Sequence, residues 1–404
     1  MLNSILWTCV ACILASALNF FYRNFPGWDV FLLPMLFASI IHAIRSLLVD
    51  HIDLKREQFK RQDHLPKGHA EHFHAARRTI LMQRFPGIRD LLGPSHFTVS
   101  CILLTVIFDI IFLARVRHLS VVWQSIACIL VGGYFCSICV SHWYHEIGHK
   151  LVTPSKYRNH WACFLVFFFP STGANADYML RGHIDVHHAL TYTKTDHESL
   201  DWQRVHLSSS MGKQRLIFVL KYLIFKPWNW ASRLVKIVLE MIGGTHTSAR
   251  KSISKESTFC AIAGIFFSFL FFDSLTVCLW LLLSPMSFVP VAPGFINFEI
   301  ADHFMSRPGQ PAYGNRSFWW NFISLDWGYH VLHHDLPRLS WMYYRKVGAC
   351  MNSEYEQLEN YSIVQSIKVL FKGIDDVKLE EIERMTSSLI KKDFQFQSLF
   401  LPDA

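Results

Sequence analysis

The sequence His145-Glu146-Ile147-Gly148-His149 follows directly on an apolar run, residues 120–141, that is long enough to cross a lipid bilayer. Two histidines four residues apart on a helix point in the same direction, about one turn from each other. This is the spacing of two metal ligands held by one helix. The stretch therefore places candidate metal ligands at the end of a membrane span.

Two further clusters of histidines have similar spacings. HIDVHH, from His183 to His188, has histidines at i, i+4 and i+5, and HVLHH, from His330 to His334, has them at i, i+3 and i+4. Each triplet can direct two or three imidazoles into one cavity from a single helix. A lone histidine is more often a hydrogen-bonded core residue, but three such clusters favour a metal centre. Eight histidines exceed the four ligands of a tetrahedral zinc and suit two adjacent metal ions.

The composition is that of an integral membrane protein. Of 404 residues, 51% are hydrophobic and only 17% are charged, whereas soluble domains carry about a quarter charged residues. The net charge is +8, with the basic excess in residues 50–95 and 211–256. Basic residues beside apolar spans mark the cytoplasmic side of a membrane, which explains the charge better than nucleic-acid binding does. The ten cysteines lie mostly in apolar runs, as expected for reduced thiols.

The apolar runs predict an all-α fold with about six transmembrane helices. The first four spans are residues 4–22, 28–49, 97–114 and 120–141. Residues 258–296 exceed one crossing, so we expect a hairpin that turns near Asp273, where a carboxylate avoids the bilayer centre. An even number of spans places both termini and a histidine-rich, metal-binding cap on the cytoplasmic side. Residues 162–169 are too short to cross and predict a re-entrant or buried segment, and residues 211–256 an amphipathic helix in the headgroup layer.

Several polar residues outside the three clusters need an interpretation. His64, His69, His72 and His74 fit no single helix face and are interrupted by a proline and a glycine, so we interpret them as solvated loop histidines. His142 shares a helix face with His145 and could itself bind metal, but we favour a packing or supporting role beside the ligands. Four carboxylates near the clusters could accept imidazole N–H bonds and fix the ligand tautomers. They are Glu146, Asp185, Asp196 and Asp326.

The three histidine motifs resemble those of the membrane fatty acid desaturase and hydroxylase superfamily, over residues 96–346. YHVLHHDLP, from Tyr329 to Pro337, looks like the closing motif of acyl desaturases. Four features resemble the alkane monooxygenase branch: HEIGHK, the wider second motif, Asp302-His303-Phe304 and the added N-terminal spans. The resemblance implies two irons on the cytoplasmic face, with no catalytic residues beyond the metal ligands. The implied ligands are His145, His149, His183, His187, His188, His303, His330, His333 and His334.

The resemblance also implies an O2-dependent oxidoreductase that acts on C–H bonds of a lipid or fatty acyl chain. Desaturation is the first expectation; the alternatives are hydroxylation of an alkane or acyl chain, and oxidative decarboxylation to a terminal alkene. Electrons are expected from a separate ferredoxin, rubredoxin or cytochrome b5, because we find no fused haem motif. The expected location is the endoplasmic reticulum in a eukaryote or the inner membrane in a bacterium. The implied domains are an N-terminal transmembrane hairpin with a basic loop (1–95), a di-iron catalytic domain (96–346) and a cytoplasmic helical tail (347–404).

Two other classes compete with this interpretation. HEIGH is also an H-E-x-x-H motif, typical of an intramembrane zinc protease. Such a protease needs a distant aspartate ligand, typically in an Asp-Gly pair that this sequence lacks, and the other histidines would have no role. A metal transporter would carry its histidines within the spans rather than at their ends.

Overall fold

The computed structural model describes residues 2–52, 54, 70–172, 176, 180, 183, 187–188, 255–285, 312, 314–315, 317–355 and 358. Regular structure within these residues is helical, apart from isolated bridges such as the one between Leu92 and Leu339. Several predictions fall outside the described residues. They concern His64, His69, Asp185, Asp196, His303, nearly all of the 211–256 segment and most of the C-terminal tail.

Four helical segments are long and apolar enough to cross a membrane, at the positions that the sequence predicts. They are Ile5–Asn24 within α1 (Leu2–Asn24), Trp28–Val49 (η1, Trp28–Leu32, and α2, Leu33–Val49), α4 (His96–Val116) and Val121–Gly148. In the first segment, only 6% of the apolar stretch is buried inside the protein. Its apolar side chains therefore suit a lipid environment, where a helix satisfies its own backbone hydrogen bonds.

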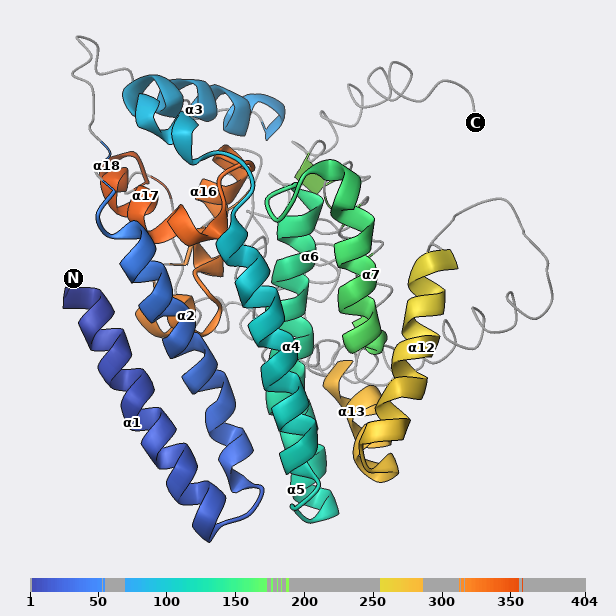
Figure 1. Cartoon of the computed structure of the whole chain (residues 1–404). Helices are drawn as coiled ribbons and strands as arrows, with labels where there is room; N and C mark the ends of the chain where they lie inside the picture. The colour runs from blue at the N-terminus through green and yellow to red at the C-terminus, as the bar shows by residue number, and fades with distance from the viewer. Residues whose placement is uncertain are drawn as a thin grey trace, which may run out of the picture.

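The fourth span leads straight into the first histidine motif. It begins as α5 (Val121–Ala127), passes through two π-helical segments, η3 (Cys128–Gly132) and η4 (Tyr134–Cys139), and ends as α6 (Val140–Gly148). π-Helical turns are rare and frequently occur at functional sites. The two hairpins, α1–α2 and α4–α6, each return the chain to the same end of the bundle (Figure 1).

The predicted hairpin near Asp273 is confirmed. α12 (Lys255–Phe271) and α13 (Ser274–Leu283) meet at Asp273, whose carboxylate accepts a hydrogen bond from the backbone N–H of Thr276 at 3.0 Å. This N-cap satisfies one of the unpaired amides at the start of α13. Both helices are shorter than the four candidate spans, so the count of six crossings stays a prediction.

All but the last residue of the predicted short segment at 162–169 lies in α7 (Arg158–Phe168), which packs along α12 (Figure 1). Ala162, Leu165 and Val166 on α7 are buried. The contact is close because Gly264 has no side chain: a Cβ at this position would overlap the carbonyl oxygen of Phe167. Small residues permit this kind of close helix approach in membrane proteins.

Short helices form a cap at the end of the bundle to which the two hairpins return (Figure 1). α3 (Ala70–Arg84) lies across this end, next to the short helices of residues 330–355. The other cap elements are η2 (Pro86–Leu91), α15 (Phe318–Ile323), η10 (Trp327–Tyr329), α16 (His330–Asp335), η11 (Trp341–Tyr343), α17 (Tyr344–Cys350) and α18 (Asn352–Tyr355). All three histidine motifs contribute to this region.

Candidate metal centre

The end of α6 positions the first histidine motif. His145 and His149 lie one helical turn apart, and the backbone N–H of His149 donates to the carbonyl of His145 at 3.0 Å. Lys150 has a left-handed φ of 62°, which ends the helix immediately after the motif. The two imidazoles therefore project from the last turn of the helix on the same side, as their spacing predicts.

A left-handed turn leads into the third motif. Leu325 and Asp326 have φ values of 57° and 65°, an uncommon conformation for residues other than glycine. The Asp326 carboxylate forms an ion pair with Arg45 of α2 and accepts a hydrogen bond from Arg345 of α17 at 2.7 Å. These contacts connect the turn to a membrane span and to the cap, so they fix where η10 and α16 begin.

Eight histidines converge in two groups, and most of their side chains are buried. The five-histidine cluster contains His145, His149, His183, His188 and His333, and the three-histidine cluster contains His187, His330 and His334. Within each group the potential ligand atoms all lie within 4.8 Å of one another. The structure thus brings together eight of the nine predicted ligands; the ninth, His303, is outside the described residues.

Distances within the five-histidine cluster match those between ligands of one metal ion. The Nε2 atom of His333 lies 2.8 Å from that of His145 and 2.9 Å from that of His188, and His149 Nε2 lies 3.1 Å from His188 Nε2. Two nitrogens each about 2.1 Å from one metal are about 3.0 Å apart at a right angle and about 3.4 Å apart at a tetrahedral angle. The cluster therefore has the dimensions of a coordination shell.

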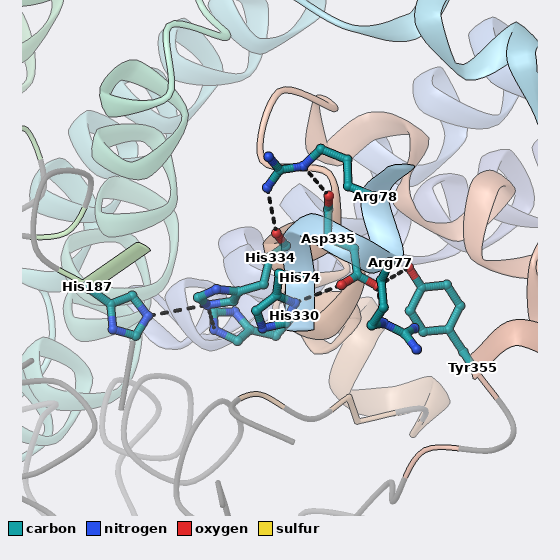
Figure 2. A network of polar contacts seen from close by, with 8 residues as sticks. All are labelled: His74, Arg77, Arg78, His187, His330, His334, Asp335 and Tyr355. Carbon is teal, nitrogen blue, oxygen red and sulfur yellow. Dashed lines mark hydrogen bonds and ion pairs between the residues drawn. The ribbon is translucent and has the colours of Figure 1, made fainter. Parts of the chain in front are cut away.

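The three-histidine cluster has the same dimensions and adjoins the first. His334 Nε2 lies 3.1 Å from His330 Nε2 and 3.3 Å from His187 Nε2 (Figure 2). The rings of His188 and His334, one from each cluster, have centroids only 4.3 Å apart. Two metal ions bound at these positions would be neighbours, as in two-metal enzyme sites.

Burial keeps these imidazoles in the form that binds metal. It lowers the pKa values of His188, His333 and His334 well below that of a free histidine, and repulsion between neighbouring imidazoles adds to the effect. A neutral imidazole has a lone pair available for a metal, whereas a protonated one does not. Sets built of imidazole suit iron, copper and zinc, so the donor chemistry fits a metal centre of this kind.

The groups that support the ligands differ in part from those predicted. The Tyr344 hydroxyl lies 2.8 Å from His333 Nδ1, on the side of the ring away from the cluster. Glu146 accepts a hydrogen bond from the Ser340 hydroxyl at 3.2 Å, and its carboxylate lies 3.9 Å from His145 Nδ1, beyond hydrogen-bond distance. Asp326, also proposed as an imidazole acceptor, binds arginines instead. Among the described residues, Asp335 is the carboxylate that hydrogen-bonds a histidine, His74.

The interpretation of His74 as a solvated loop residue is wrong. His74 lies in α3, is 9% exposed, and its ring centroid is 4.9 Å from that of His334. The proline and glycine that suggested a loop, Pro66 and Gly68, both precede the helix. The signal that could have revealed it is the spacing of His74, Arg77 and Arg78, which share one helix face.

The expected packing role of His142 is confirmed. Its ring is fully buried, with centroids 4.9 Å from Trp327 and 5.4 Å from Trp341, in edge-to-face arrangements. Trp327 also packs edge-on against His145 at 4.8 Å. These aromatic rings form an apolar wall beside the five-histidine cluster and exclude water from that side.

A helical membrane protein with two adjacent imidazole clusters at one end of its spans belongs to the class of histidine-rich membrane oxidoreductases. The model of the fatty acid desaturase family matches residues 121–362, more than half of the chain, and the chain belongs to this family. It is an O2-dependent, desaturase-like enzyme of the membrane. The zinc-protease and metal-transporter interpretations are not favoured.

Individual relatives are distant but extend over most of the chain. The sphingolipid delta(4)-desaturase DES1-like protein of Arabidopsis thaliana is 25% identical over 344 residues, 79% of this chain and 90% of the relative. The sphingolipid delta(4)-desaturase DES1 of Mus musculus is 24% identical, with 77% and 91% covered. The sphingolipid delta(4)-desaturase/C4-monooxygenase DES2 of Rattus norvegicus is 23% identical, with the same coverage. No solved structure matches the chain.

Proposed function

We propose that this membrane desaturase introduces a double bond into the long-chain base of a sphingolipid, with two irons held by the histidine clusters. The observation that carries the proposal is the convergence of eight imidazoles into two adjacent shells, in a chain whose relatives are sphingolipid desaturases. Bound iron would supply O2 activation and hydrogen removal from an unactivated C–H bond. Hydroxylation is the second candidate product, because one relative is also named a C4-monooxygenase.

The residues of the chain have distinct roles in this proposal. The five-histidine cluster would hold one iron and the three-histidine cluster the other, with His303 as a proposed ninth ligand. If His333 binds through Nε2, its Nδ1 carries the proton and donates to the Tyr344 oxygen, which fixes the tautomer and the ring orientation. Trp327 packs edge-on against His145 and would shield one side of the bound metal from water.

Electrons are proposed to come from a separate acidic carrier, such as cytochrome b5, a ferredoxin or a rubredoxin. The support lies in the sequence: residues 211–256 carry nine lysines and arginines and only two acidic residues, directly after the second histidine motif. Opposite charges accelerate encounter at low salt. Turnover should therefore fall as ionic strength rises from about 0.05 to 0.5 M, a range over which the Debye length shrinks severalfold. A rate that does not change with salt argues against an acidic donor.

The substrate can be tested in cells that lack sphingolipid desaturase activity. Full-length protein is expressed, a sphingolipid with an isotope-labelled saturated base is supplied, and the lipids are analysed by mass spectrometry. Loss of two hydrogens from the base is expected; gain of one oxygen would indicate hydroxylation. Labelled base recovered unchanged, while a supplied fatty acyl lipid is converted, would refute the sphingolipid assignment.

A matched pair of histidine variants connects the activity to the clusters. His187→Ala removes a buried member of the three-histidine cluster and is expected to abolish conversion while the protein stays in the membrane. His160→Ala removes an exposed histidine of α7 and is expected to leave conversion unchanged. Full activity in His187→Ala would place the reaction elsewhere.

The proposed topology puts both termini and the clusters in the cytoplasm, in the endoplasmic reticulum of a eukaryote or the inner membrane of a bacterium. The basic 50–95 segment supports this orientation. Single cysteines introduced at position 70, beside the clusters, and at position 118, at the far end of α4, should react with an impermeant reagent from opposite sides. Labelling of both positions from one side would refute this topology.

We also propose the domain division at residues 95 and 346.

A further inference from the structure

One face of α3 meets the end of the helix that carries the third histidine motif (Figure 2). His74, Arg77 and Arg78 stand at i, i+3 and i+4 on α3, and all three contact the last residues of α16. The family match begins at residue 121, so these contacts come from a part of the chain outside it. The point at which they meet is Asp335, the residue that directly follows His334.

The Asp335 carboxylate is fully buried and accepts three hydrogen bonds. His74 Nδ1 lies 2.7 Å from Oδ1, and because an ionised carboxylate only accepts, the imidazole donates here. Arg77 Nε donates to Oδ2 at 2.9 Å, and the Tyr355 hydroxyl donates to the same oxygen at 2.8 Å. Charged hydrogen bonds of this kind are stronger than neutral ones and fix the geometry of both partners.

Arg78 acts on the backbone of the same helix. Its Nε donates to the carbonyl oxygen of Asp335 at 2.7 Å, and its Nη2 lies 3.4 Å from the carbonyl oxygen of His334. The last carbonyls of a helix have no partner within the helix, and an arginine that binds them satisfies these groups and complements the helix dipole. Arg78 is therefore a C-terminal cap supplied by α3.

α16 needs external support because it is short. It contains six residues, and an isolated helix of this length does not persist in water. Three of those six residues are histidines of the two clusters. His333 has its own contact with Tyr344. His334 belongs to the three-histidine cluster and packs beside His74 of α3, and its Nε2 lies 3.1 Å from that of His330 in the same cluster (Figure 2).

We propose that His74, Arg77 and Arg78 act through Asp335 as positioning residues for the three-histidine cluster, so that α3 determines how tightly this cluster binds its metal. The inference rests on the proposed metal centre. Because the five-histidine cluster draws four of its members from other segments, it keeps its metal when the α3 contacts are lost. We call His74, Arg77, Arg78 and Asp335 the clamp. Loss of the clamp should therefore weaken the metal of the three-histidine cluster and leave the other metal in place.

Release of metal to a chelator tests this selectivity on purified full-length protein. The wild type should release its two irons in two phases, one for each cluster. Asp335→Asn keeps the side-chain volume and removes the charge, and it should accelerate one phase by about tenfold, the lower end of the effect of groups that support metal ligands. His74→Phe and Arg77→Met should accelerate the same phase, and Arg77→Lys should restore it in part.

Asp29→Asn is the matched control. Asp29 is a buried carboxylate that accepts a hydrogen bond from Arg115 Nε at 3.1 Å, at the opposite end of the bundle, and this variant should release both irons as the wild type does. Release from Asp335→Asn that matches the wild type would overturn the clamp. Equal acceleration of both phases together with a lower melting temperature would also overturn it, since that pattern reports general loosening.

The outcome is separable from that of the proposed function. If the wild type binds two metals but converts no sphingolipid, the substrate assignment fails while the release phases still decide the clamp. If the wild type converts sphingolipid and every α3 variant keeps both metals as tightly, the clamp alone fails.

Discussion

Replacing Asp326 by Asn should destabilise the protein by removing one partner of a buried ion pair. Asp326 is fully buried, Arg45 is 3% exposed, and the carboxylate also holds Arg345. Breaking such a pair costs about 3–5 kcal/mol, because the remaining charge is buried without compensation. Asn tolerates the left-handed conformation about as well as Asp, so the backbone turn does not confound the result.

The assay is thermal unfolding of detergent-solubilised protein, followed by tryptophan fluorescence at a fixed scan rate. At roughly 2 °C per kcal/mol for a chain of this size, the midpoint should fall by roughly 6–10 °C. Adding Arg45→Met removes the uncompensated charge and should recover part of the loss. A fall of less than about 2 °C in Asp326→Asn, or a double variant as unstable as the sum of the single changes, would refute the reasoning.

Two further predictions concern packing and the support of one ligand. Gly264→Val should lower the unfolding midpoint by several degrees, because the new side chain overlaps the Phe167 carbonyl. Gly87→Ala is the control, since its Cβ makes only an ordinary contact with Leu54 and should leave the midpoint unchanged. Equal midpoints in the two variants would contradict the close approach of α7 and α12. Tyr344→Phe removes the hydroxyl beside His333 Nδ1 and should weaken metal retention by about 10–100-fold in a chelator titration, with Tyr343→Phe as control. Equal retention in the two tyrosine variants would exclude support through this hydroxyl.

The membrane helices could be predicted from the sequence because length and hydropathy determine them almost completely. A segment such as 28–49 is predominantly apolar and has the length of a bilayer core, so the sequence alone indicates both its type and its approximate limits. The turn at Asp273 followed from the cost of a carboxylate at mid-bilayer. The π-helical turns of the fourth span were missed, since an apolar run does not reveal how its hydrogen bonds shift.

The support of the clusters could be predicted only in part, because it depends on contacts between distant segments. Asp326 pairs with arginines that lie 281 positions before it and 19 positions after it, and nothing local distinguishes this from an imidazole contact. The role of His74 depends on Asp335, 261 residues away. The sequence spacing shows that His74 and Arg77 share one helix face, because that depends on neighbouring residues only. It does not show that this face contacts Asp335, because that depends on how distant segments pack.

Helix geometry accounts for part of the division of the eight histidines into groups of five and three. Residues four apart share a helix face, which agrees with the pairing of His145 with His149 and of His330 with His334. His183 and His187 are also four apart but fall in different clusters, so spacing alone does not assign every histidine. Adjacent residues on a helix point about 100° apart, and the structure places His187 and His188 in different clusters, as it does His333 and His334. In the proposed metal centre, each consecutive pair of histidines would supply one ligand to each cluster. On α16, the pair His333 and His334 would then let one short helix contribute to both metals.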